Sequence, residues 1–175
     1  MFYTMWFEED VKIPLSSEMK EKEVFEVLKR KYVGKIIEGF GICVVITECA
    51  RVEEYQVYDE FLAAHAKFEM LLFKFFRDEV MYGEILEQNS EGIRVGISFF
   101  DEIQVKKDNL AEGSEMVYVS DGGEKKAAWV WIYKGNRFYL RRKSKVRLRV
   151  LWDCTDGCVM CDFKEMGLGP IDWWE

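Results

Sequence analysis

Residues 79–110 read EVMYGEILEQNSEGIRVGISFFDEIQVKKDNL, and short apolar runs alternate there with polar turns. Within this stretch Ile93, Val95 and Ile97 occupy every second position, and a period of two predicts a strand with one buried face. A polar break that contains a glycine precedes this strand, and the acidic pair at 101–102 predicts a second turn. Three strands joined by two turns are how a small antiparallel barrel begins, although any β-meander has the same spacing.

Two segments downstream extend the β pattern toward the C-terminus. The segment 127–133, AAWVWIY, is predicted as a strand that carries its two Trp residues and Tyr133 on one face. The segment 145–151, KVRLRVL, alternates basic and apolar residues, which predicts one buried face and one positively charged face. Residues 122–126, GGEKK, are expected to form a loop.

The first half of the chain predicts a small α+β unit in the order β-α-β-β. The aromatic-rich residues 2–7 predict a first strand, which we expect the acidic residues 8–10 to end in solvent. Two serines at 16–17 are suitable N-caps for a helix that runs to about residue 31, because their hydroxyl oxygens can accept hydrogen bonds from the first turn. Apolar side chains recur from Val24 at helical spacing, which predicts one buried face of that helix.

Two further strands are expected between this helix and residue 78. The apolar, β-branched run at 42–46 predicts a strand buried on both faces. Residues 51–64 are expected to form a polar and aromatic loop that is partly helical at 59–64. Residues 65–76 alternate in part, which predicts a long strand that carries every second residue from 66 to 72 on one face.

Length and composition allow one medium domain or two small ones. The 175 residues are 49% hydrophobic and 33% charged, which is enough for a packed core and a soluble surface. We predict two domains, 1–78 and 79–175. No secretory signal, transit peptide or apolar run long enough to span a bilayer is visible, so we expect no membrane contact. The five cysteines are an odd count, and we expect reduced thiols in an intracellular protein.

The basic residues are unevenly placed. The net charge of -7 argues against a generic basic nucleic-acid-binding protein, yet residues 134–149 hold eight basic residues and no acidic one. Such side chains can contact phosphates through a salt-dependent attraction that does not depend on base sequence, and OB-type barrels bind single strands in such grooves. A solvated outer face, or a patch that meets the acidic first half, explains the pattern equally well. The clustered residues are Arg137, Arg141, Arg142, Lys143, Lys145, Arg147 and Arg149.

Patterns for catalysis and metal binding are weak. The one histidine, His65, lies in a predicted strand, which favours a structural role over that of a general base. No Ser/His/Asp ordering, H-E-x-x-H, phosphate-binding loop or dinucleotide glycine motif occurs. Cys154, Cys158 and Cys161 have C-x3-C-x2-C spacing, but structural zinc sites use four ligands. We therefore predict no enzyme activity, no metal and no cofactor.

Six segments, in collinear order across nearly the whole chain, resemble one protein family. They resemble the larger stalk subunit of eukaryotic RNA polymerase III, which shares its architecture with subunits of polymerase II and of archaeal polymerase. The Phe-Phe pair before two acidic residues and the terminal Trp-Trp are typical of the polymerase III branch. The segments are MFYTMWFEEDVKIP (1–14), KYVGKIIEGFGICVV (31–45), AHAKFEMLLFKFF (64–76), GIRVGISFFDEI (92–103), AAWVWIY (127–133) and GLGPIDWWE (167–175).

The resemblance implies an α+β protein with a truncated RNP-like tip domain followed by an OB-fold barrel. It implies a heterodimer with a smaller helical stalk subunit, docking of the tip domain to the polymerase III core near the clamp, and a role in transcription initiation in the nucleus. It also implies that the OB domain contacts nascent single-stranded RNA. We assign that contact to Arg137, Arg141, Arg142, Lys143, Lys145 and Arg147, with Lys106 and Lys107 as a second set. The expected core-docking residues of the tip loops are Pro14, Leu15, Tyr55, Tyr58 and Phe61.

The chain departs from the family pattern in three regions. Family members usually carry a second proline and an aromatic residue at 15–17, and a Pro-Gly-Asp-Gly turn in the loop at 57–66. Residues 153–165 replace a longer insertion, and we expect them to form a loop that holds the three clustered cysteines. Ile93 stands where many RNA-binding OB domains have a stacking aromatic residue, which favours phosphate contact over base stacking.

Other functions remain open at this point. The same fold would suit a polymerase II stalk subunit, or a protein-docking module whose basic face binds an acidic factor in place of RNA. An enzyme of RNA processing would need a general base or a metal that these residues do not supply.

Overall fold

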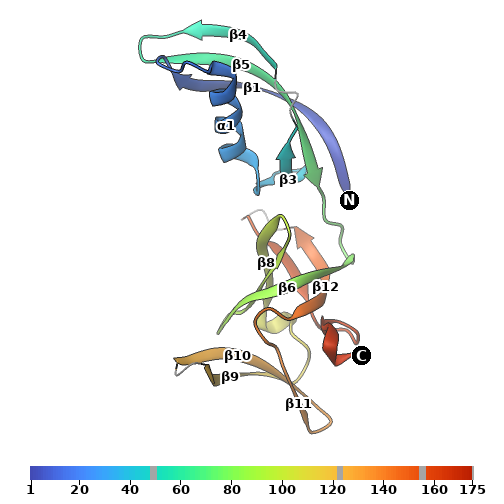
Figure 1. The fold of residues 1–175 in the computed structure, drawn as a ribbon. Helices are drawn as coiled ribbons and strands as arrows, with labels where there is room; N and C mark the ends of the chain where they lie inside the picture. The colour runs from blue at the N-terminus through green and yellow to red at the C-terminus, as the bar shows by residue number, and fades with distance from the viewer. Residues whose placement is uncertain (48–50, 122–123, 154–156, 175) are drawn as a thin grey trace. The chain divides into compact units, whose positions relative to one another are not determined.

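The computed structural model describes residues 1–47, 51–121, 124–153 and 157–174. It divides into two compact units, Met1–Lys74 and Phe75–Glu175, slightly ahead of the boundary that we predicted after residue 78 (Figure 1). The first unit is a sheet with one helix and the second contains a closed barrel, as the predicted fold class required. Within the described ranges, no helix combines the length and the apolar character that crossing a bilayer demands.

The N-terminal unit is built around the long strand β5. β1 pairs antiparallel with β5 along one whole edge, from Phe2↔Phe73 to Pro14↔Phe61. β3 and β4 share the opposite edge of β5, because β3 pairs with 70–73 and β4 pairs with 62–67. β2 extends the sheet beyond β3. The elements are β1 (Phe2–Pro14), α1 (Lys20–Tyr32), β2 (Ile36–Ile37), β3 (Gly41–Ile46), β4 (Arg51–Val57) and β5 (Phe61–Phe73).

One face of this sheet packs against the helix. Every second residue of β5 from Leu62 to Leu72 is buried, which confirms the alternation predicted for 66–72. Val24 and Leu28 present the apolar face of α1 to that surface, as Figure 1 shows for the helix and the sheet. Burial in the same core raises the pKa of the Cys43 thiol to about 11, so the thiol stays protonated at neutral pH.

The acidic residues 8–10 do not end the first strand, contrary to expectation. They lie within β1, and two of them pair across the sheet with basic partners on β5. Glu8 is 3.0 Å from Lys67, and Asp10 is 2.7 Å from His65. Because opposite charges face each other directly across the two strands, the acidic run continues the strand.

Three other local predictions for this unit are wrong. The predicted loop at 51–64 is mostly strand: residues 51–57 form β4, because β5 offers a second free edge to pair with, and 61–64 belong to β5 instead of a helical segment. The helix begins after Met19 with no side-chain cap, while Ser17 closes a turn onto the carbonyl of Pro14. β3 is not buried on both faces, since Val45 is 42% exposed.

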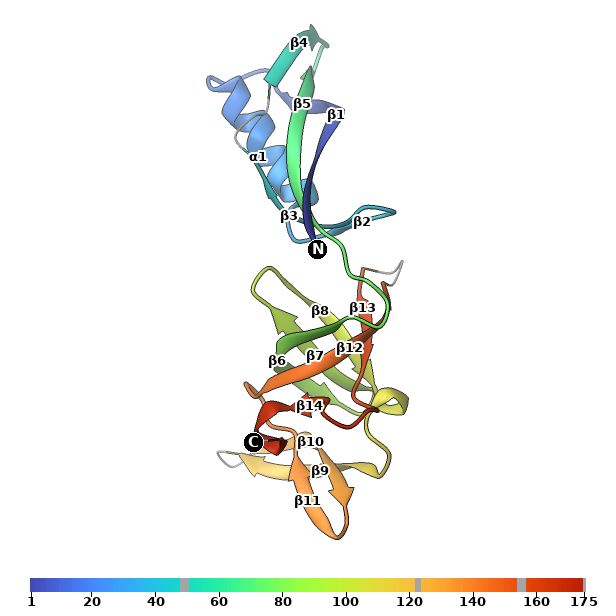
Figure 2. The same cartoon turned by 90° about the vertical axis from the view of Figure 1, so that its right-hand side faces the viewer.

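The C-terminal unit contains a closed five-stranded barrel beside a small separate sheet (Figure 2). The barrel order is β6-β7-β8-β13-β12, and β12 pairs back with β6. Only the β13–β8 pair among these is parallel, which is the connectivity of an OB fold. The elements are β6 (Val80–Asn89), β7 (Gly92–Ile97), β8 (Phe100–Lys106), η1 (Lys107–Asn109), β9 (Ser114–Asp121), β10 (Glu124–Tyr133), β11 (Asn136–Tyr139), β12 (Lys145–Asp153), β13 (Val159–Asp162), β14 (Gly169–Pro170) and η2 (Ile171–Trp173).

The alternation of the barrel strands is largely as predicted. Ile93 and Val95 on β7 are buried, and so are Val146, Leu148 and Val150 on β12. The turn between β7 and β8 lies at 98–99, and the acidic pair at 101–102 belongs to β8 instead of forming the turn.

Two segments have places in the fold that differ from those that the sequence suggests. The strand at 127–133 lies in the separate sheet β11-β10-β9 and not in the barrel. The fifth barrel strand comes from Val159–Asp162, within the region predicted as a loop. All of its residues are buried between β8 and β12, so its environment decides its conformation. Of the predicted loop at 122–126, Glu124, Lys125 and Lys126 belong to β10 instead, and Gly122 and Gly123 lie outside the described residues.

The start of β7 requires a glycine at position 92. Gly92 has φ of +147°, and a Cβ atom there would lie far inside van der Waals contact of the Val105 carbonyl oxygen. We expect Gly92→Ala to destabilise the protein by roughly 3 kcal/mol in chemical denaturation, because backbone atoms cannot move aside cheaply. Gly135→Ala is the matched control: Gly135 also has a positive φ of +80° but has nothing within 4 Å of the added methyl group. Equal losses for both variants would contradict the close approach of β7 and β8.

The Asp10–His65 pair predicts a measurable pH effect. The hydrogen bond that the Asp10 carboxylate accepts from His65 raises the pKa of His65 above its ordinary value. The stabilisation from the pair is therefore fully present below the unfolded-state pKa of His65 and is lost as the pH rises through the higher folded-state pKa. We expect Asp10→Asn to lower the pKa of His65, measured by NMR titration of this one histidine, and Glu53→Gln to lower it less. An unchanged pKa in Asp10→Asn would show that the pair does not form in solution.

Candidate nucleic-acid interface

Most of the predicted basic residues lie on one turn and at the start of the strand that follows it. Arg141, Arg142 and Lys143 are exposed in the connection between β11 and β12, and Lys145 is exposed at the start of β12. The backbone of this connection is tied to β6, because the N–H of Lys143 donates to the Ile85 carbonyl at 2.8 Å. The Ile85 N–H donates in return to the Ser144 carbonyl at 3.0 Å. The backbone that carries these positive charges is therefore fixed to β6 by two hydrogen bonds.

Two other members of the set lie further from this turn. Arg137 is exposed on β11. Arg147 lies on β12 with its guanidinium 5.4 Å from the ring of Tyr82, and it donates a hydrogen bond to the Tyr82 hydroxyl at 3.2 Å. Tyr82 is itself 60% exposed, so this pair presents a cation and an aromatic ring at the surface.

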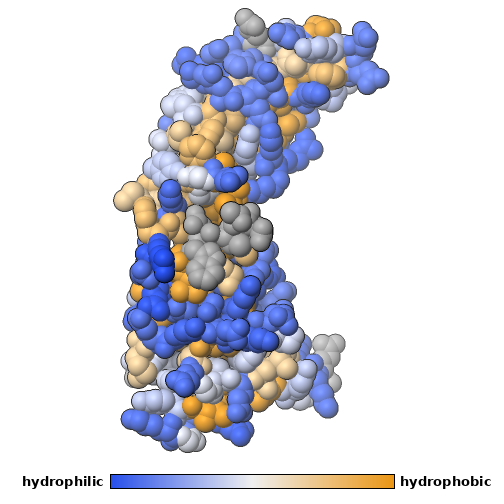
Figure 3. All heavy atoms as spheres, turned by 180° about the vertical axis from the view of Figure 1, so that it is seen from behind, coloured by the Kyte–Doolittle hydropathy of each residue, from blue (hydrophilic) through white to orange (hydrophobic). Residues whose placement is uncertain are grey.

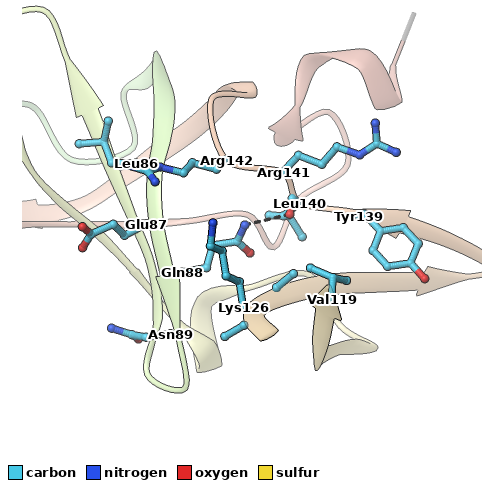
Figure 4. A pocket seen from close by; sticks show the side chains of 12 residues that line it. Leu86, Glu87, Gln88, Asn89, Val119, Lys126, Tyr139, Leu140, Arg141 and Arg142 are labelled. Carbon is cyan, nitrogen blue, oxygen red and sulfur yellow. Dashed lines mark hydrogen bonds between the residues drawn. The ribbon is translucent and has the colours of Figure 1, made fainter. Parts of the chain in front are cut away.

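A groove of about 700 Å³ lies beside the basic turn, between the barrel strand β6 and the small sheet (Figure 4). Its basic rim consists of Lys126, Arg141 and Arg142. Figure 4 shows Arg142 extended toward Leu86 of β6, with Tyr139 and Arg141 at the opposite end. The other residues that line it are Leu86, Glu87, Gln88, Asn89, Val119, Ala127, Ala128, Tyr139 and Leu140.

The side chain of Gln88 holds the walls of this groove together. Its Nε2 atom donates to the carbonyl of Leu140 at 2.9 Å, and its Oε1 atom accepts the backbone N–H of Trp129 at 2.8 Å. Leu140 and Trp129 are also joined directly, because the N–H of Leu140 donates to the Trp129 carbonyl at 2.9 Å. One amide on β6 thus fixes both β10 and the segment that carries Arg141 and Arg142.

Lys126 is a basic residue of the groove that the sequence does not reveal as a candidate. We placed it in a loop, but it belongs to β10 and points into the groove beside Gln88 (Figure 4). The signal in the sequence was the Lys-Lys pair directly before an aromatic strand. That signal does not reveal which wall the lysine faces, because the position of the small sheet against β6 is a tertiary feature.

The face of the barrel on which OB folds usually bind oligonucleotides is acidic here. That face is formed by the second and third barrel strands, which are β7 and β8 in this chain. Arg94 on β7 is surrounded by carboxylates, with Glu87 at 3.1 Å, Glu102 at 3.6 Å and Asp101 at 3.7 Å. Glu87 also lines the groove, and its pairing with Arg94 offsets the negative charge that it brings there.

The second predicted set is separate from the groove. Lys106 ends β8 and Lys107 begins η1, and both are exposed. They line a hollow of about 380 Å³ together with the acidic residues Glu87, Glu91 and Asp108. This mixed charge makes the hollow a weaker site for phosphate than the groove.

Arg149 does not belong to the exposed basic face, contrary to expectation. Its side chain is 21% exposed and donates to Asp162 at 2.8 Å, and it also pairs with Glu165. The hydrogen bond to Asp162 raises the pKa of Arg149 above its ordinary value. This guanidinium therefore serves the internal structure of the barrel.

The predicted tip residues come together at one end of the N-terminal sheet. Pro14 at the end of β1 is paired with Phe61 at the start of β5, and the ring of Tyr58 stacks on Phe61 at 4.8 Å. Tyr55 lies nearby on β4 with the Lys20 ammonium 5.4 Å from its ring centroid. Leu15, Tyr55 and Tyr58 are exposed apolar side chains. In Figure 3, hydrophobic residues coloured orange reach the surface between hydrophilic ones in both units.

The clustered cysteines do not form a described site. Cys161 is buried on β13, where desolvation, with a contribution from Asp162, raises the pKa of its thiol well above the usual range. Cys158 is half-buried, and Cys154 lies outside the described residues. Among the residues that are described, no group of three or more His, Cys, Asp or Glu side chains could hold a metal ion.

Comparisons with known proteins point to one family. Residues 79–154 match the family model described as RNA polymerase III subunit Rpc25. The chain is 27% identical over 180 residues to the DNA-directed RNA polymerase III subunit RPC8 of Bos taurus, covering 85% of each chain. It is 32% identical over 139 residues to rpc8 of Schizosaccharomyces pombe, covering 77% of this chain and 66% of the relative. It is 30% identical over 127 residues to RPC8 of Saccharomyces cerevisiae, covering 70% of this chain and 57% of the relative.

Proposed function

This chain belongs to the Rpc25/RPC8 family, the larger stalk subunit of RNA polymerase III, and on that premise we propose that its barrel unit contacts nascent RNA. The family is one of non-catalytic subunits, and membership of a eukaryotic polymerase III implies the nucleus. The chain thereby contributes binding surfaces to a polymerase whose chemistry takes place on other subunits. Its part in transcription initiation belongs to the same proposal.

The groove beside the basic turn is the observation that supports RNA contact. Lys126, Arg141 and Arg142 line it, and Lys143 follows on the same hydrogen-bonded turn. Each cation that reaches a phosphate releases bound counterions, so the resulting affinity falls with salt and tolerates any base sequence. The acidic face around Arg94 repels phosphate, so the favoured RNA path runs along the groove and not across β7 and β8.

We assign a different task to the exposed end of the N-terminal sheet. Pro14, Leu15 and the rings of Tyr55, Tyr58 and Phe61 offer an apolar surface of the kind that protein interfaces use. In this proposal they contact the polymerase core near the clamp. The smaller helical stalk subunit covers other exposed apolar side chains of the chain, which include Phe2 and Trp6.

Removal of the basic turn tests the RNA contact. We expect the triple variant Arg141→Gln, Arg142→Gln, Lys143→Gln, purified with its smaller partner, to bind a single-stranded RNA oligonucleotide about tenfold or more weakly. With roughly 0.7 counterions released per single-strand phosphate, the slope of log affinity against log salt should fall by about 2. Titration by fluorescence anisotropy at four salt concentrations measures both quantities.

A matched control removes the same charge from the other unit. Lys22→Gln, Arg30→Gln and Lys35→Gln together delete three exposed positive charges of the N-terminal unit and should leave the salt slope unchanged. An unaltered affinity and slope in the basic-turn variant would exclude RNA as the ligand of this turn. If an acidic factor peptide then bound the wild type and not that variant, the basic face would be a protein-docking surface.

Co-purification tests the proposed assembly. A tagged copy of the chain should recover polymerase III subunits and a smaller stalk partner at 1:1, since isolated chains would expose several large aromatic side chains to water. Recovery of polymerase II subunits would support the alternative branch. A chain that stays monomeric and soluble at high concentration without a partner would contradict an obligate pair.

A further inference from the structure

We infer that the groove takes up one unstacked nucleobase against the ring of Tyr139, an inference that rests on the proposed RNA contact and specifies its mode. The bound RNA is therefore single-stranded at this point, with its phosphates on the basic rim. Sequence reasoning favoured phosphate contact alone, because Ile93 stands where many OB domains have a stacking aromatic residue. Tyr139 supplies an aromatic ring at a different place, on β11 beside the barrel.

The alternation of β11 separates Tyr139 from the aromatic cluster of the small sheet. Phe138 packs among Trp131 at 5.4 Å and Trp173 at 5.7 Å, on one face of the strand. Successive side chains of a strand point to opposite faces, so Tyr139 faces away from this cluster. Tyr139 is 37% exposed, lines the groove, and makes no ring stacking or cation–π contact with any described residue. Its ring is thus available to a ligand.

The walls of the groove suit a flat, partly apolar ligand. Leu86, Val119 and two small alanines, Ala127 and Ala128, provide apolar surface without filling the space. The amide of Gln88 is fixed by its hydrogen bonds to the Leu140 carbonyl and the Trp129 N–H, so it cannot turn to match the edge of one particular base. We therefore expect a base to be held by stacking and not by sequence-specific hydrogen bonds.

Charge selects the class of ligand. The rim carries the exposed side chains of Arg141 and Arg142, whereas the one acidic residue of the lining, Glu87, is paired with Arg94 at 3.1 Å. A positive rim around an apolar floor complements a chain that alternates phosphates with aromatic bases. A duplex keeps its bases stacked inside, so it could use the rim and not the floor.

The test compares Tyr139→Ala with Tyr139→Phe in the purified heterodimer. Loss of one stacking ring should weaken binding of a single-stranded RNA about tenfold without changing the salt slope, because no phosphate contact is lost. Tyr139→Phe keeps the ring and should bind as the wild type does. Affinity for a double-stranded RNA of the same length should be equal in all three proteins. Circular dichroism melting curves check that each variant remains folded.

Each other outcome overturns the inference in a recognisable way. Wild-type single-strand affinity in Tyr139→Ala would exclude base stacking here, while a reduced salt slope in the basic-turn variant would still support RNA contact. Equal weakening of single- and double-stranded binding in Tyr139→Ala would assign the residue a merely structural role. An acidic peptide whose binding depends on Tyr139, while RNA binding does not, would make the groove a protein site.

Discussion

The barrel depends on a buried ion pair at the position where it closes. Asp162 on β13 is 1% exposed, and a carboxylate in that position is costly without a partner. Arg149 on β12 supplies one at 2.8 Å, which lets β13 lie between β8 and β12. Glu165 also accepts from Arg149 and holds the guanidinium at this edge. The same pair explains why Arg149, a basic residue of the alternating strand β12, is mostly buried.

Charge is distributed around the closed barrel in a way that total charge conceals. The chain has a net charge of -7, yet its basic turn is positive and is hydrogen-bonded to β6. Arg94 on β7 is outnumbered by three carboxylates, Glu87 of β6 and Asp101 and Glu102 of β8. The barrel surface is therefore acidic on the face where related folds bind nucleic acid. A small added sheet, held to β6 through Gln88, creates a positive groove elsewhere.

The two faces of the N-terminal sheet carry different kinds of side chain. The helix covers one face, whose core includes Phe68 and Met70. On the other face, ion pairs such as Glu8–Lys67 make a charged strand stable in water over part of its length. Exposed apolar side chains such as Phe2 and Trp6 occupy the remainder of β1. The apolar part of this outer face can pack against other subunits. The charged part is compatible with contact to water.

Sequence alone determined the parts of this protein that depend on local pattern. Alternation on β5, β7 and β12, the helical face of α1 and the concentration of basic residues at 134–149 could all be read from neighbouring positions. The resemblance of collinear segments then identified the family. These features are encoded within short windows, because side-chain periodicity follows from backbone geometry.

Tertiary structure decided which strands meet and which charges remain outside. The aromatic strand β10 reads like a barrel strand but joins a separate sheet, whereas the short, cysteine-containing β13 completes the barrel. β4 reads as a loop and becomes a strand because β5 leaves an edge open to it. Arg149 and Arg147 are equivalent in the pattern, but only Arg149 meets a buried carboxylate. Strand pairing and ion pairing join residues that are far apart in the sequence. Which residues meet is therefore decided by the folded structure and not by a short stretch of sequence.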